Sequence, residues 1–173
     1  MAGSPHWQFV IDDDSPEIAY YPFVNLEPSS NVSAGWQLMY TGSGVATSPG
    51  QVGVGSSFHY TSVNGASLMI NWNGMCAPKR NTVSSRATRV AGTGIDLIGS
   101  VSNASYNISL DGVPSSSNST DSENSVLASF DDLENANHSL LLTTIITNAT
   151  SPDAFLTFDE AVITYSPPTG IPK

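Results

Sequence analysis

The chain has 173 residues, of which 39% are hydrophobic and 12% charged, and this length suits one globular domain with a core of its own. Fifteen acidic residues against five basic ones give a net charge of -10, which disfavours binding to nucleic acid or to an anionic membrane. The single cysteine excludes a disulfide within the chain, and no stretch approaches the roughly 18 apolar residues of a membrane-spanning helix.

Short runs of alternating apolar and polar residues follow one another along the chain, which is typical of strands with one buried face. In chain order the sequence predicts strands at Trp7 to Ile11, Ile18 to Phe23, Trp36 to Tyr40, Ser57 to Val63, Ser67 to Trp72, Gly94 to Val101, Ala104 to Asp111, Val126 to Phe130, Ser139 to Ile146 and Phe155 to Tyr165. No segment has the period of an amphipathic helix. The predicted fold class is therefore all-β, with two antiparallel sheets stacked as a β-sandwich.

The strongest local prediction is a hairpin over Ser57 to Trp72. Both of its strands alternate apolar and polar residues, and Asn64-Gly65 lies between them. Asn-Gly tolerates the positive φ angles that a tight type I′ turn requires. We therefore expect the two strands to pair directly.

Turn-forming residues mark the boundaries of the domain and its loops. Two stretches rich in Gly, Ser and Asn, 42–56 and 114–124, predict long exposed loops. Residues 166–173 contain three prolines and predict a linker after a single domain at 1–165. The first ten residues lack the basic and apolar regions of a signal peptide.

Residues 75–92 differ in composition from the rest of the domain. They hold Cys76 and four of the five basic residues, and removing these 18 residues would join two predicted strands by a short turn. One interpretation is a basic loop that docks an acidic partner or is processed. The other, which we favour, is a translated intron, because the flanking codons accommodate splice signals and 18 codons keep the frame.

Six Asn-x-Ser/Thr triplets predict a secreted or cell-surface protein, because each is a potential N-glycan acceptor. They lie at Asn31, Asn103, Asn107, Asn118, Asn137 and Asn148. Chance is the alternative, since the chain is rich in Ser and Thr. The local pattern favours acceptors: Tyr106 and Ile108 share one face of a predicted strand, so Asn107 lies on the opposite face, toward water.

Acidic residues gather after the first predicted strand, at Asp12, Asp13, Asp14 and Glu17. Such oxygens suit a structural Ca²⁺, which takes six to eight oxygen ligands. Asp159 would join Asp12 and Asp13 if the first and last strands are neighbours. The alternative is a solvated turn in which the aspartates bond to nearby backbone.

Two aromatic residues are candidates for sugar recognition, which stacks an aromatic ring on the apolar face of a pyranose. Tyr20 and Tyr21 are adjacent on a strand, so that if Tyr20 faces the core, Tyr21 faces outward. Trp36 precedes a glycine-rich and serine-rich loop, which would place it at a rim. Packing within the core is the alternative for each ring.

No enzyme motif is present. The three histidines, at positions 6, 59 and 138, are too far apart for a recognisable metal-ligand spacing, and no nucleophile elbow, phosphate loop or dinucleotide fingerprint occurs. We therefore expect no catalytic activity and name no catalytic residue. His138 is expected to make local hydrogen bonds.

Several short motifs follow one another along the chain: Val10-Ile-Asp-Asp-Asp14, Phe58-His-Tyr-Thr61, Thr93-Gly-Ile95, Leu110-Asp-Gly112, Asn137-His138-Ser139-Leu140 and Phe158-Asp159. Their order resembles that in the ectodomains of fungal single-pass membrane proteins. The fifth departs from the family pattern, which usually has Gly-x-His-Thr-Leu there. The resemblance implies a galactose-binding-domain-like jelly roll, without residues 75–92, and a signal peptide and membrane helix that this chain does not show.

The function expected from these observations is non-catalytic carbohydrate binding, with cell-wall or glycoprotein glycans as partners. An interaction or spacer ectodomain without a small ligand is the alternative, and a degenerate hydrolase is a third.

Overall fold

The computed structural model describes residues 7–23, 34–48, 51–73, 93–115, 125–134, 136–147 and 153–165. Their twelve strands are β1 (Trp7–Asp12), β2 (Ile18–Tyr21), β3 (Gln37–Tyr40), β4 (Gly44–Val45), β5 (Ser57–Thr61), β6 (Ser67–Asn73), β7 (Thr93–Ser102), β8 (Ser105–Leu110), β9 (Val113–Ser115), β10 (Val126–Leu133), β11 (Asn137–Ile145) and β12 (Phe155–Tyr165). All ten predicted strands are present. The two that were not predicted, β4 and β9, are the shortest. Among the described residues there is no α-helix, and hence none long and apolar enough to cross a membrane.

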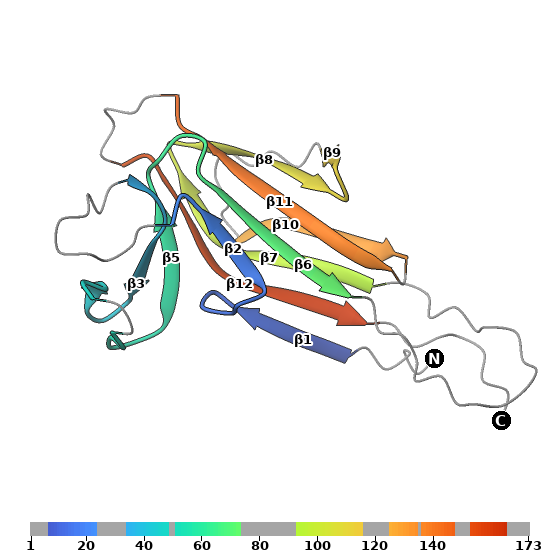
Figure 1. The fold of residues 1–173 in the computed structure, drawn as a ribbon, viewed down its shortest axis with the longest axis horizontal. Helices are drawn as coiled ribbons and strands as arrows, with labels where there is room; N and C mark the ends of the chain where they lie inside the picture. Colours follow the sequence, from blue (N-terminus) through green and yellow to red (C-terminus); the bar gives the residue numbers. More distant parts are fainter. Residues whose placement is uncertain are drawn as a thin grey trace, which may run out of the picture.

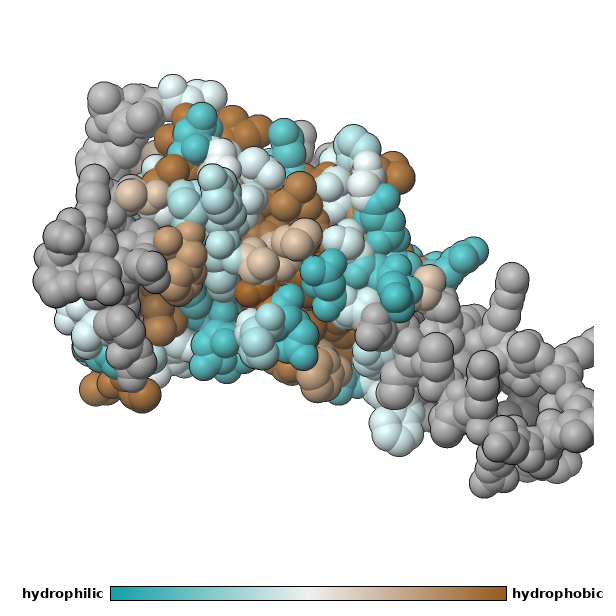
Figure 2. All heavy atoms as spheres, viewed as in Figure 1, coloured by the Kyte–Doolittle hydropathy of each residue, from teal (hydrophilic) through white to brown (hydrophobic). Residues whose placement is uncertain are grey.

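The strands form two antiparallel sheets that pack face to face, so the predicted all-β sandwich is confirmed. Sheet A has seven strands, in the order β10-β7-β12-β5-β3-β4, with β1 also paired to β12. Sheet B has five strands, in the order β2-β6-β11-β8-β9. In Figure 1 the strands of sheet B are drawn in front of those of sheet A. Polar and apolar side chains are intermixed on the face seen in Figure 2.

The core lies between the two sheets and follows the alternation of the sequence. In β8, Tyr106 and Ile108 are buried and Asn107 is exposed, as predicted. The Tyr106 hydroxyl crosses the core and donates a hydrogen bond to the carbonyl of Leu127 in sheet A. Each fully buried Leu, Ile or Phe contributes about 1.5–3 kcal/mol, so these inward faces hold the sheets together.

The predicted hairpin over Ser57 to Trp72 is wrong, because β5 lies in sheet A and β6 in sheet B. The amide of Ala66 donates to the carbonyl of Val63, so a turn is present. Only Gly65 has a positive φ there, at 80°, whereas a type I′ turn needs two such residues. The Asn64 side chain instead accepts a hydrogen bond from the Ile146 amide, 3.0 Å away, and ties the crossover to the end of β11.

The predicted continuation from β6 into β7 does not form a hairpin either. These strands lie in different sheets, so the chain passes from sheet B to sheet A between them. Residues 75–92, whose nature the sequence leaves open, lie outside the described residues. The predicted linker at 166–173 does as well. The predicted loop at 42–56 contains β4, and the amides of Thr41 and Gly42 donate hydrogen bonds to the carbonyls of Ser56 and Val54 across its base.

One edge of β12 is shared by two strands. Residues 156–158 pair with β5, and residues 160–165 pair with β1, so the first and last strands are neighbours as expected. The register against β7 shifts between Phe158 and Glu160, which identifies a β-bulge at Asp159. The turn that follows β1 therefore lies beside the start of β5.

Candidate functional site

An open hollow of about 390 Å³ lies on the outer face of sheet A. It is lined by hydroxyl side chains, two apolar side chains, one glycine and one carboxylate: Thr41, Ser56, Ser57, Ser100, Ser125, Thr157, Phe58, Ile98, Gly99 and Asp159. This mixture of hydroxyl, aromatic and acidic groups makes the hollow the candidate functional site.

Three adjacent strands form the floor of the hollow. Phe58 in β5, Thr157 in β12 and Ser100 in β7 are partly exposed, and the residue that follows each of them is buried in the core: His59, Phe158 and Val101. Because side chains alternate across a sheet, the first three point away from the core and into the hollow. Phe58 supplies a half-buried aromatic ring among hydroxyl groups.

The hydroxyl groups of Ser100 and Thr157 are linked. Their oxygens lie 2.7 Å apart, and the Ser100 amide donates to the Thr157 hydroxyl at 2.9 Å. Gly99 lies beside this pair, and a Cβ there would meet the Thr157 carbonyl oxygen at 2.2 Å. Glycine is therefore required for β7 and β12 to approach this closely.

The β-bulge in β12 adds a carboxylate to the hollow. Phe158 pairs with Gly99 and Glu160 pairs with Ile98, which leaves Asp159 between them without a partner in the ladder. Burial raises the pKa of the Asp159 carboxyl, and the negative charges of Glu160, Asp13 and Asp12 raise it further. Because other carboxylates surround it, the Asp159 carboxylate binds neutral or cationic groups in preference to anions.

A buried hydrogen-bond network lies next to the hollow. The carboxylate of Asp13, which is fully buried, accepts a hydrogen bond from the Ser57 hydroxyl at 2.6 Å, and its other oxygen lies 2.8 Å from Nδ1 of His59. Ser57 also lines the hollow. A buried carboxylate needs such partners, since an unpaired one is costly. The network fixes the turn after β1 against the start of β5.

Aromatic rings enclose this network. Tyr20 stacks on His59, with ring centroids 4.0 Å apart, and its hydroxyl donates to the Asp13 carbonyl. Burial, with added repulsion from Asp13, Asp14 and Asp12, raises the pKa of Tyr20 well above its usual range, so the hydroxyl keeps its proton. His59 is 4% exposed and Asp13 0%. Both groups are closed to solvent, and their contacts join the turn after β1 to Ser57 at the rim of the hollow.

The two tyrosines of β2 face in opposite directions, as the alternation predicted. Tyr20 packs against the core and Tyr21 is 74% exposed on sheet B. The prediction for Trp36 is wrong, because this residue is fully buried and packs 5.2 Å from Tyr20 between ring centroids. Trp36 lies just before β3 and faces the core, so its ring is closed to a sugar.

The carboxylates proposed for Ca²⁺ come near one another without forming a metal-ligand group. Asp12 and Asp13 both contribute to the raised pKa of Asp159, so the three share one region. Within the described ranges, however, no three His, Cys, Asp or Glu side chains are placed to hold a metal ion. The Asp13 carboxylate instead makes hydrogen bonds with Ser57 and His59.

The sequons in the described part of the chain are exposed. Asn107 and Asn137 extend from the outer face of sheet B, and Asn103 lies in the turn between β7 and β8. The other three, at positions 31, 118 and 148, lie outside the described residues. Glycans at Asn107 and Asn137 would leave the hollow in sheet A uncovered.

A second His–Asp pair lies in sheet B, between the start of β11 and the turn after β8. His138 Nδ1 lies 2.8 Å from Asp111 and its Nε2 lies 2.7 Å from the Glu134 carbonyl, which fits the local hydrogen bonding expected for this residue. The hydrogen bond from His138 lowers the pKa of Asp111. Burial acts to lower the pKa of His138, but Asp111 and the carbonyl outweigh it and the pKa is raised. The pair joins β11 to the β8–β9 turn.

Sequence reasoning missed the hollow because its residues come from separate strands and are mostly Ser and Thr.

No protein-family model matches the chain, and no curated protein is significantly similar to it.

Proposed function

We propose that this domain is a non-catalytic carbohydrate-binding module of a secreted or cell-surface glycoprotein. The hollow on the outer face of sheet A binds the sugar. The observation that carries the proposal is the placement of the Phe58 ring beside the Ser100–Thr157 hydroxyl pair and the Asp159 carboxylate on one open face.

This set of groups matches the surface of a pyranose. The apolar face of the sugar stacks on Phe58, and its hydroxyl groups exchange hydrogen bonds with Ser100, Thr157 and Asp159. A carboxylate accepts hydrogen bonds from two vicinal hydroxyls of a neutral sugar. The net charge of -10 disfavours acidic sugars, so neutral glycans are the expected ligands.

The positions of the exposed sequons also support a sugar site on the outer face of sheet A. Asn107 and Asn137 lie on sheet B, and glycans there would keep the opposite face open for binding. The resemblance to ectodomains with a galactose-binding-like fold also favours sugar recognition at the cell surface.

Binding to an array of neutral glycans, with and without a chelator, tests the proposal. We expect binding in the micromolar to millimolar range that is lost in the Phe58→Ala and Asp159→Ala variants. A chelator should leave binding unchanged, because no three carboxylates among the described residues are placed to hold a metal ion. The matched control is Tyr21→Ala, which removes an exposed ring from sheet B and should bind normally.

The outcomes separate the two functions under consideration. Loss of binding in Tyr21→Ala, with Phe58→Ala unaffected, would move the site to sheet B. A blank array with correctly folded protein would favour a spacer ectodomain without a small ligand.

A further inference from the structure

The outer edge of β1 is a sheet edge that carries exposed apolar side chains. Along its six residues β1 pairs with β12 on one side, and no described strand pairs with its other side. Trp7, Phe9 and Val10 are 63%, 55% and 49% exposed. An unpaired edge presents backbone donors and acceptors, and proteins usually block it with Lys, Pro or a bulge. The strand Trp7–Asp12 has none of these.

A pocket of about 170 Å³ opens beside this edge. Both apolar and polar side chains line it: Phe9, Ile11, Ile163 and Tyr165 from sheet A, Asn71 and Trp72 from β6, and Glu17 from the turn after β1. It stays open because β2 covers β6 only from Ser67 to Ile70, which leaves the rest of β6 unpaired on that side. An apolar side chain of an added strand would contact Phe9 and Trp72 here, and a polar one would reach Asn71 or Glu17.

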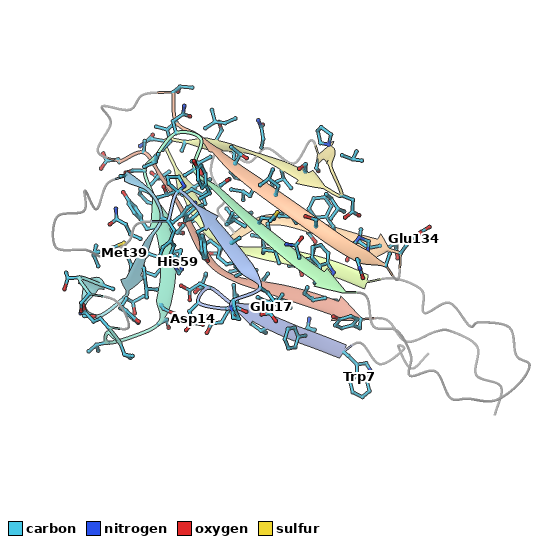
Figure 3. The ribbon with its side chains drawn as sticks, viewed as in Figure 1. Trp7, Asp14, Glu17, Met39, His59 and Glu134 are labelled. Carbon is cyan, nitrogen blue, oxygen red and sulfur yellow. The ribbon has the colours of Figure 1, made fainter. Side chains whose placement is uncertain are left out.

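Negative charge concentrates at one end of β1. Figure 3 shows Trp7 at the start of the strand and Asp14 and Glu17 close to its other end. Asp12 and Asp14 are exposed, Glu17 lines the pocket, and the described part of the chain contains no Lys or Arg. An occupant with basic residues at this end complements the edge, whereas the β1 edge of a second copy carries the same acidic end and is repelled.

From these observations we infer that the β1 edge binds an extended peptide segment of a protein partner. The segment adds a strand to sheet A, places alternate apolar side chains in the pocket, and pairs a basic residue with Asp14 or Glu17. This interaction surface is separate from the sugar site on the outer face of sheet A.

The test uses the full chain and three synthetic peptides of ten residues. The first alternates Val and Thr and has two Arg residues at one end. The second replaces both Arg with Glu, and the third has a proline at its centre. We expect the first to bind, to shift Trp7 fluorescence and to protect β1 amides from hydrogen exchange, and the other two to bind at least about tenfold more weakly.

Two variants check the location. Phe9→Lys should weaken binding at least about tenfold, and Phe9→Leu should restore it. Leu141→Lys, which changes an exposed apolar residue on the outer face of sheet B, should bind as the unchanged protein does.

Three results would overturn the proposal. The first is equal binding of the Arg and Glu peptides. The second is a dimer that Phe9→Lys dissolves, since a second copy would then occupy the edge. The third is no peptide binding together with β1 amides that are fully protected in the free monomer, since the chain would then cover its own edge.

Discussion

The carboxylate of Asp13 lies 2.8 Å from Nδ1 of His59 inside the core, although 46 residues separate the two in the sequence. The contact joins the turn after β1 to β5. It lies where the strand paired with this edge of β12 changes from β1 to β5. Burial makes the pair costly to break, because either partner alone would be an unsatisfied polar group.

Replacing Asp13 by Ala should lower the free energy of unfolding by about 3 kcal/mol, because Ser57 and His59 would lose a buried acceptor. Chemical denaturation measures this change. Asp14→Ala is the control: Asp14 is exposed, and its loss should change stability by less than about 0.5 kcal/mol. Equal effects of the two substitutions would contradict the structural role of the Asp13–His59 pair.

Asp159→Asn should stabilise the protein at neutral pH. The raised pKa of Asp159 means that the folded state holds this proton more tightly than the unfolded state. Stability therefore falls as pH rises from the ordinary value of 3.8 through the raised pKa, and the cost persists at pH 7. We expect a gain of up to about 1 kcal/mol at pH 7, limited by solvent screening, and none below pH 3. Thermal unfolding across this range measures it, and a loss of stability at pH 7 would contradict the assignment.

The His138–Asp111 pair should stabilise the protein most in mildly acidic solution. The contribution of His138, whose pKa is raised, is present below 6.5 and lost as pH rises through the folded-state pKa. That of Asp111, whose pKa is lowered, is present above 3.8 and lost as pH falls through the folded-state pKa. Asp111→Asn should thus cost up to about 1 kcal/mol near pH 5 and less near pH 8. A cost that does not change between these two pH values would argue against an ion pair.

Gly99→Ala should destabilise the sandwich by about 1–3 kcal/mol, because the new methyl group would overlap the Thr157 carbonyl. Ser102→Ala is the control, since it changes a partly exposed residue of the same strand and should be nearly neutral. Denaturant midpoints of both variants provide the comparison. A neutral Gly99→Ala would mean that β7 and β12 are less closely packed than described.

The sequence predicted the strands well because alternation depends only on neighbouring residues. It could not assign strands to sheets. Asn64-Gly65 suits a hairpin, yet here Asn64 bonds to the Ile146 amide and the chain crosses to the other sheet. Such a choice depends on a partner 82 residues away.

The candidate site was harder to predict for the same reason. Tyr21 was correctly expected to face outward, but Trp36 is buried in the core. The acidic cluster around Asp13 suggests a metal ligand, and nothing near Asp13 in the sequence points to its partner His59. Ser100 and Thr157 carry no motif, and only the register of β7 against β12 brings them together.

Chemical-shift mapping with a neutral oligosaccharide tests the central claim most directly. Backbone amide signals are followed during the titration, with the Phe58→Ala variant as the comparison. The proposed module predicts saturable shifts that centre on Phe58, Ser100, Thr157 and Asp159 and disappear in the variant. Shifts confined to sheet B around Tyr21, or no saturable shifts with any neutral glycan, would contradict it.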